Sequence, residues 1–197
     1  MPYTIVLAPP AHSASKYVEA SQALYRHYQP SYLLSVDGNS FPHITVIQFN
    51  CDSLEVAYAV WNKMCDKMEK ERFTPFPPPF TGISFITGVG PYEGTTWVEL
   101  SVARGQETSP IMKVHYAALE VLKLFNLQPL NASDNNYRPH LTLARIVMPK
   151  QMPVWNVNLL ENFADFRLEF GLSDEKWQYV RPLGTFSHNL MSEEERV

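Results

Sequence analysis

Two short elements of similar sequence carry the residues best suited to chemistry. Residues 41–49 read Phe-Pro-His-Ile-Thr-Val-Ile-Gln-Phe, and residues 138–145 read Arg-Pro-His-Leu-Thr-Leu-Ala-Arg. Each places a histidine two residues before a threonine, with apolar neighbours: His43 with Thr45, and His140 with Thr142. Chance predicts about 0.06 such elements in a chain of this composition, so the repetition indicates a shared role.

The spacing within each element is typical of a strand. Successive side chains of a strand face opposite ways, so His43 and Thr45 project together while Ile44 points into the core. His140 and Thr142 share a face in the same manner. The histidines are 97 positions apart (140 − 43), about half of the 197-residue chain. If the two halves pack about an approximate two-fold axis, one cleft receives both imidazoles and both hydroxyls.

Two imidazoles and two hydroxyls suit an in-line displacement at phosphorus. One group must take a proton from water, and another must give a proton to the leaving oxygen. Imidazole can do both near neutral pH. Threonine hydroxyls can hold the non-bridging oxygens as negative charge accumulates. These residues predict general acid and base catalysis on a cyclic phosphodiester, with no metal and no other cofactor required.

The two elements resemble those of the 2H phosphoesterases, and most closely the bacterial and archaeal 2′,5′ RNA ligase-like cyclic phosphodiesterases. The resemblance implies a bilobal α+β fold and metal-free hydrolysis of 2′,3′-cyclic phosphates to 2′-phosphates. It also implies His140 as base, His43 as acid and a contact of Arg145 with phosphate. In the first element, Val-Ile-Gln-Phe at 46–49 replaces the family's commoner Leu-x-Phe-aliphatic continuation.

Two further residues are candidates for substrate binding. Strict alternation places Arg145 on the face opposite His140, so a phosphate contact requires a β-bulge or the strand's end there; the alternative is an edge arginine. Tyr137 directly precedes the second element and is the preferred aromatic for stacking on a base, although a loop tyrosine can equally pack on the domain. Other aromatics open to this role are Phe41, Tyr92 and Trp97.

Less specific interpretations apply to the remaining chemistry-bearing residues. His27 and His115 lie in expected helices, where packing or exposure explains a histidine, and His12 and His188 have no comparable partner. A zinc site is disfavoured because no third ligand stands at a recognisable spacing. A non-catalytic nucleotide-binding module and a 2′,5′-phosphodiesterase remain as alternatives to the cyclic phosphodiesterase.

The hydrophobic patterning predicts an α+β fold that positions these elements. We expect two mainly antiparallel sheets related by a pseudo-two-fold axis, with helices outside and a central cleft, in a single bilobal domain over 1–197. The Pro-rich stretch 74–80 runs extended as a buried connection between the lobes. Expected helices cover 15–28, 53–71, 109–125 and, briefly, 157–163, and expected strands cover 3–8, 32–34, 44–49, 83–86, 95–102, 141–147, 166–170 and 177–180.

Composition restricts the partners. The formal charge of −4 provides no broad basic surface, so we expect a small nucleotide or an RNA terminus as ligand and exclude duplex nucleic acid. Two cysteines match no disulfide framework, and no segment has the length of a membrane span. We therefore expect a cytoplasmic monomer without membrane contact, whose residues 192–197 fray at the end of the chain.

Overall fold

The computed structural model describes residues 2–28, 32–34, 40–90, 93–147, 157–174 and 177–187. Tyr92, His188, residues 35–39 and the charged segment 192–197 therefore lie outside the described residues. The order of elements follows the sequence prediction closely. The strands are β1 (Pro2–Ala8), β2 (Tyr32–Leu33), β3 (Ile44–Asn50), β4 (Phe80–Thr87), β5 (Thr95–Val102), β6 (His140–Val147), β7 (Arg167–Ser173) and β8 (Tyr179–Thr185), and the helices are α1 (Ala11–Tyr28), α2 (Leu54–Lys70) and α3 (Pro110–Leu124).

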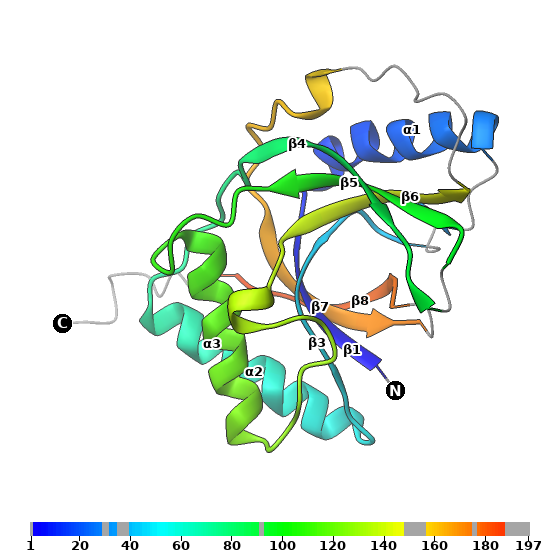
Figure 1. The fold of residues 1–197 in the computed structure, drawn as a ribbon. Coiled ribbons are helices and arrows are strands. Elements are labelled where there is room, and N and C mark those ends of the chain that lie inside the picture. The colour runs from blue at the N-terminus through cyan, green and yellow to red at the C-terminus, as the bar shows by residue number, and fades with distance from the viewer. Residues whose placement is uncertain are drawn as a thin grey trace.

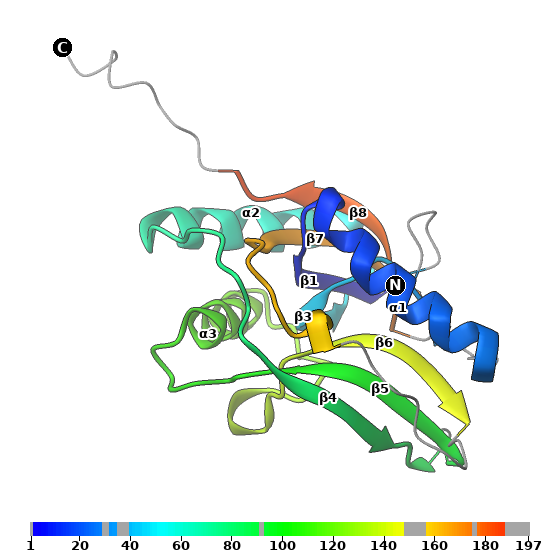
Figure 2. The ribbon, with the colours of Figure 1, turned by 90° about the horizontal axis from the view of Figure 1, so that it is seen from above.

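The strands form one antiparallel sheet in the order β4-β5-β6-β3-β1-β7-β8, with β2 pairing with β6. β3 and β6 are joined through a single residue pair, Ile44 with Leu141. The strand groups on either side of this junction diverge (Figure 2). The expectation of two separate sheets is therefore wrong in this respect, because this one pair links the two groups into a continuous sheet.

The helices cover the sheet at different places. α2 and α3 lie side by side, α3 packs against β3, and α1 packs against β6 (Figure 1). Ser53 caps α2, since its hydroxyl accepts a hydrogen bond from the backbone amide of Val56. None of the described helices has the length and apolar character needed to cross a membrane.

Aromatic side chains fill much of the core. The ring of Tyr3 on β1 stacks between Phe49 and Phe170, which lie on the flanking strands β3 and β7. The Pro-rich connector runs extended as expected, and Phe76 and Phe80 within it pack against the core. The two phenylalanines hold the connector between α2 and β4 against the core, but Thr74, Pro77 and Pro79 are exposed, so the expected burial applies to only part of the segment.

Candidate functional site

The two His-x-Thr elements meet where β3 joins β6. Ile44 is the register partner of Leu141, and both side chains are fully buried. The pair at Ile44 and Leu141 brings the residues on either side of it, His43 and Thr45 from one element and His140 and Thr142 from the other, to the same junction. Alternation then turns these four side chains to the face opposite the core. A single backbone pairing thus brings together residues that are 97 positions apart (140 − 43) in the sequence.

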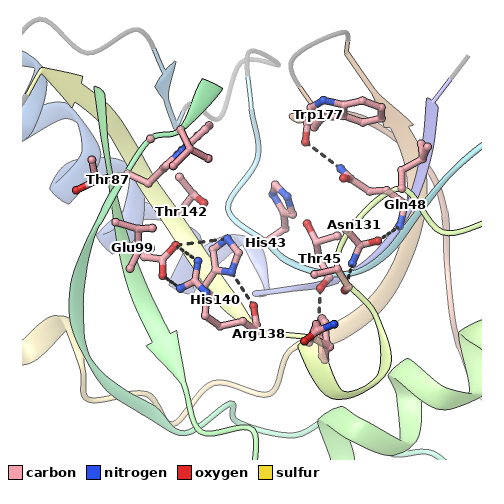
Figure 3. Close-up of a pocket in the computed structure, with 18 residues that line it drawn as sticks. His43, Thr45, Gln48, Thr87, Glu99, Asn131, Arg138, His140, Thr142 and Trp177 are labelled. Atoms are coloured by element: carbon pink, nitrogen blue, oxygen red, sulfur yellow. Dashed lines mark hydrogen bonds and ion pairs between the residues drawn. The ribbon is translucent and has the colours of Figure 1, made fainter. Parts of the chain in front are cut away.

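All four residues line one pocket of about 510 Å³. Tyr137 also contributes to its lining. Figure 3 shows His43 and His140 in the middle of the pocket, with Glu99 and Thr87 on one side and Gln48 and Trp177 on the other. The pocket is thus built around the two predicted elements, and its walls include residues of β4 and β5 on one side and of β3 and the segment before β8 on the other.

The same local hydrogen bond orients both imidazoles. The Nδ1 atom of His43 lies 2.7 Å from the Phe41 carbonyl, and that of His140 lies 2.8 Å from the Arg138 carbonyl. Each carbonyl belongs to the residue before the intervening proline, whose ring restricts the local backbone. A carbonyl can only accept, so Nδ1–H donates and the Nε2 atom remains for proton transfer.

The two histidines differ in their surroundings. His43 is 7% exposed, and its ring meets the edge of the Tyr179 ring at 5.5 Å between centroids. Burial lowers the pKa of His43 to about 4, with a smaller contribution from the nearby His140. The side chain of His140 is about one-third exposed, and its Nε2 lies 3.5 Å from Glu99 Oε2. His43 is therefore neutral at pH 7, whereas His140 has a carboxylate neighbour.

Glu99 and Arg138 are pocket residues that the sequence reasoning missed. The side chain of Glu99 is 1% exposed, and its carboxylate accepts hydrogen bonds from both terminal nitrogens of Arg138, including one of 3.2 Å from Nη2. Arg138 stands inside the second element, two residues before His140. A glutamate within the apolar run of β5 was the available signal, because such residues are rarely buried without a partner.

The loop before the second element completes the backbone pairing of β3. Beyond Ile44, β3 diverges from β6, and side chains of the loop and of α3 bond its backbone instead. Tyr137 donates its hydroxyl to the Thr45 carbonyl at 2.8 Å, His115 bonds the Val46 carbonyl through Nδ1 at 2.9 Å, and the Asn131 side chain accepts from the Gln48 amide at 2.7 Å. These bonds hold the loop, and with it His140, against β3.

Tyr137 and His115 form a packed pair beneath the pocket. Their rings stack at 3.9 Å between centroids, and Tyr137 is 4% exposed. The Nε2 atom of His115 accepts from the Asp134 amide, and burial lowers its pKa. The tyrosine therefore packs on the domain, and little of its ring is left for a base. His115 has the packing role that the sequence favoured.

Arg145 lies beside the pocket without lining it. The register runs from Val98–Ala144 to Glu99–Thr142, so Leu143 is an extra residue in β6 and forms a bulge, one of the two conditions for a phosphate contact of Arg145. The bulge turns Arg145 to the side of Trp97, with Cζ 5.0 Å from the ring centroid. Arg145 is 7% exposed and does not belong to the described pocket lining. Its contact with phosphate stays a prediction.

Gln48 and Trp177 form the opposite wall and were also missed. Gln48 belongs to the part of the first element that departs from the family pattern. The side-chain Nε2 of Gln48 donates to the Trp177 carbonyl at 2.9 Å. This hydrogen bond holds Trp177 in place, although its backbone has the left-handed angle φ +66°. Trp177 is 42% exposed, so it presents an aromatic surface to the pocket.

The other chemistry-bearing residues that the structure describes lie apart from this pocket. Cys51 and Cys65 are free thiols. Over the part of the chain that the structure describes, no group of three or more His, Cys, Asp or Glu side chains is arranged to hold a metal ion. His12 is exposed and lines a separate pocket at the start of α1.

Comparison with known proteins shows a likeness in structure. No family model and no curated protein matches the chain. Crystal structures of E. coli LigT complexed with NADP+ and with 3′-AMP match at TM-scores of 0.56 and 0.54, with 13% and 12% identity. They cover 94% and 93% of this chain and 97% and 95% of theirs. A structure described as a phosphoesterase matches at TM-score 0.50 and 14% identity, over 93% of this chain and 95% of that one. The chain thus has the fold of LigT, a 2H phosphoesterase of the 2′-5′ RNA ligase family, as the paired His-x-Thr elements predicted.

Proposed function

We propose that the protein is a 2H-type phosphoesterase that opens the 2′,3′-cyclic phosphate of a nucleotide or RNA end to a 2′-phosphate, without a metal. The observation that carries the proposal is the junction of β3 and β6, which sets both histidines and both threonines around one pocket. The LigT-like fold supports the processing of phosphodiesters. The small nucleotides present in the LigT complexes support a ligand of that class.

The surroundings of the two histidines support distinct roles. Water attacks phosphorus in line with the 3′ oxygen, a P–O bond to water forms, and the P–O3′ bond breaks. His43, neutral at pH 7, accepts the proton of the water at Nε2. His140, beside the Glu99 carboxylate, donates a proton to O3′. This assignment reverses the roles that the resemblance implies, because burial disfavours the charged form of His43.

The remaining pocket residues support binding of the nucleotide. Thr45 and Thr142 supply hydroxyl donors for the non-bridging oxygens, one from each strand. The exposed ring of Trp177 supports a stacking contact with a base on the Gln48 side, a role for which the ring of Tyr137 is poorly exposed. Arg145 packs on Trp97, which lines the pocket, so it supports this wall from behind.

An assay of hydrolysis with EDTA present tests the proposal. The substrates are 2′,3′-cyclic nucleotides, 2′,5′-linked oligonucleotides, ADP-ribose cyclic phosphate and 3′,5′-cyclic oligonucleotides, and ³¹P NMR identifies the phosphate position in each product. We expect turnover of the 2′,3′-cyclic substrates to 2′-phosphates and a bell-shaped pH–rate profile. His43→Ala and His140→Ala should each lower kcat at least about 100-fold.

The matched control is His12→Ala, at an exposed histidine outside this pocket. It should retain wild-type turnover. Full activity of His43→Ala or His140→Ala contradicts the acid–base pairing, and loss of activity in EDTA that zinc restores favours a metallohydrolase. Binding of nucleotides without turnover of any substrate favours the non-catalytic module, and cleavage confined to 2′,5′ linkages favours the 2′,5′-phosphodiesterase.

A further inference from the structure

The carboxylate of Glu99 is the most unusual group in the pocket. It is almost fully buried, yet it lies among residues that face the proposed substrate. A buried carboxylate is costly unless it is paired and hydrogen-bonded. Here it has two partners, the guanidinium of Arg138 and the Nε2 atom of His140, which lies 3.5 Å away. One acidic side chain therefore contacts two groups that carry or can carry positive charge.

We propose that Glu99 is a positioning residue that holds Arg138 as the phosphate-binding cation and His140 as the proton donor along one wall of the cleft. The inference rests on the function proposed above and deepens it. It assigns the phosphate contact to Arg138, a residue to which neither the sequence patterns nor the family resemblance gave a role.

The geometry of Arg138 suits a phosphate better than that of Arg145. Arg138 lines the pocket with its side chain about half exposed, whereas Arg145 is buried over Trp97. Glu99 accepts from Nη1 and Nη2, and a guanidinium has five N–H donors, so further donors are available to a bound anion. Among the described lining residues, Arg138 is the sole side chain with a permanent positive charge. The ion pair with Glu99 restricts the guanidinium before the substrate arrives, which lowers the entropic cost of binding.

The second contact of Glu99 distinguishes the two histidines. The charged and titratable side chains that line the described pocket with His140 are Glu99 from β5, His43 just before β3, and Arg138 and Tyr137 from the preceding loop. Arg138 opposes a charge on His140, but Glu99 is the group directly at Nε2. On the other side, His43 meets the edge of the Tyr179 ring. Glu99 thus contacts the ring nitrogen from which the proton is to be donated, and it positions this histidine on the wall of β5.

The first test is the pH–rate profile of Glu99→Gln, which keeps the size of the side chain and removes its charge. We expect kcat with a 2′,3′-cyclic nucleotide to fall at least about tenfold. The basic limb of the profile should move, because the substitution removes the charge that lies 3.5 Å from Nε2 of the proposed donor. A structural defect alone lowers the amount of active enzyme and leaves the limb in place. The exposed acid-to-amide control, Glu107→Gln, should match the wild type in both respects. An unmoved basic limb in Glu99→Gln overturns the role of Glu99 toward His140.

The second test measures ligand binding and requires no turnover. Calorimetry compares 2′-AMP with adenosine, which lacks the phosphate. Arg138→Lys should bind 2′-AMP about tenfold more weakly, since lysine keeps the charge but loses the fork of donors, while adenosine binding stays unchanged. The double variant Glu99→Gln with Arg138→Gln leaves no unpaired buried charge, and we expect it to fold and lose about 30-fold in 2′-AMP affinity. The control is Arg167→Lys, at an exposed arginine outside the pocket, which should bind 2′-AMP and adenosine as the wild type does. Unchanged 2′-AMP affinity in both Arg138 variants overturns the assignment.

The two tests separate this inference from the proposed function. If no cyclic phosphate is turned over but 2′-AMP affinity depends on Arg138, the proposed hydrolysis fails and the phosphate contact stands. NMR of the imidazole nitrogens then replaces the pH–rate profile: the Nε2 resonance of His140 should differ between the wild type and Glu99→Gln, because the contact with the carboxylate is lost. Equal behaviour of the two proteins overturns the role of Glu99 toward His140.

Discussion

Acidification should weaken the folded state through His43, by an amount that the structure allows us to calculate. The pKa of this histidine is about 4 in the folded protein, because burial disfavours the charged ring, against an ordinary value of 6.5. The unfolded chain therefore takes up the proton more readily, so the contribution to stability is present above pH 6.5 and is lost as the pH falls toward 4. Between pH 7 and pH 5, these two pKa values correspond to a loss of about 2 kcal/mol in the free energy of unfolding.

The assay is urea unfolding of the wild type and His43→Asn at pH 7 and at pH 5. Asparagine has an amide donor near the position of Nδ1, so it can keep the bond to the Phe41 carbonyl, but it does not titrate. Other groups, including the buried His115 with its lowered pKa, contribute to the pH dependence of both proteins. The difference between the two proteins isolates the contribution of His43, provided that the substitution does not alter its neighbours.

We expect the wild type to lose about 2 kcal/mol more than His43→Asn over this pH range. If the two proteins lose the same stability, His43 is not held neutral in the folded state. The assignment of His43 as the base would then lose its support. Between pH 8 and pH 7 the folded His43 stays neutral and the unfolded His43 takes up only a fraction of a proton, so the wild type should lose only about 0.1 kcal/mol more than His43→Asn.

Two further substitutions test the packing that supports the site. Tyr137→Phe removes the donor to the Thr45 carbonyl, so the loop before His140 is less firmly held. We expect the free energy of unfolding in urea to fall by about 1–2 kcal/mol and turnover to decrease. The exposed Tyr58→Phe should change neither quantity, and equal losses in both variants contradict the role of this hydrogen bond. Gly171→Ala places a Cβ against the Arg181 backbone carbonyl and 2.6 Å from the Tyr179 ring, which packs on His43, so we expect destabilisation of at least about 3 kcal/mol by thermal unfolding. Gly82→Ala meets no atom within 4 Å and should leave stability within about 1 kcal/mol of the wild type; a stable Gly171→Ala would show that β7 and β8 can separate there.

Local patterns in the sequence were sufficient for the elements and for the two motifs. The expected helix over 53–71 is observed as Leu54–Lys70 with Ser53 at its cap, because capping and helical periodicity depend on neighbouring residues. The His-x-Thr spacing depends only on the alternation of side chains along a strand. The x-Pro-His sequence that precedes each threonine also contains the carbonyl that orients the imidazole.

Long-range pairing decided what surrounds these motifs. The sequence did not reveal that β3 and β6 join through one pair, so two sheets were expected where the structure has one. The bulge at Leu143 decides on which side Arg145 lies, and the register of β5 against β6 brings Glu99 to His140. Such registers depend on contacts between residues far apart in the chain, which local propensity does not specify.

Thus the sequence alone determined which residues could carry out acid–base chemistry, since side-chain type and strand alternation are local properties. Only the tertiary structure decided how the two histidines differ. Burial beside Tyr179 keeps His43 neutral, while Glu99 reaches His140 from a neighbouring strand. The physical reason is that an imidazole's charge state depends on the solvent exposure and the charges around it, which the folded chain assembles from distant segments.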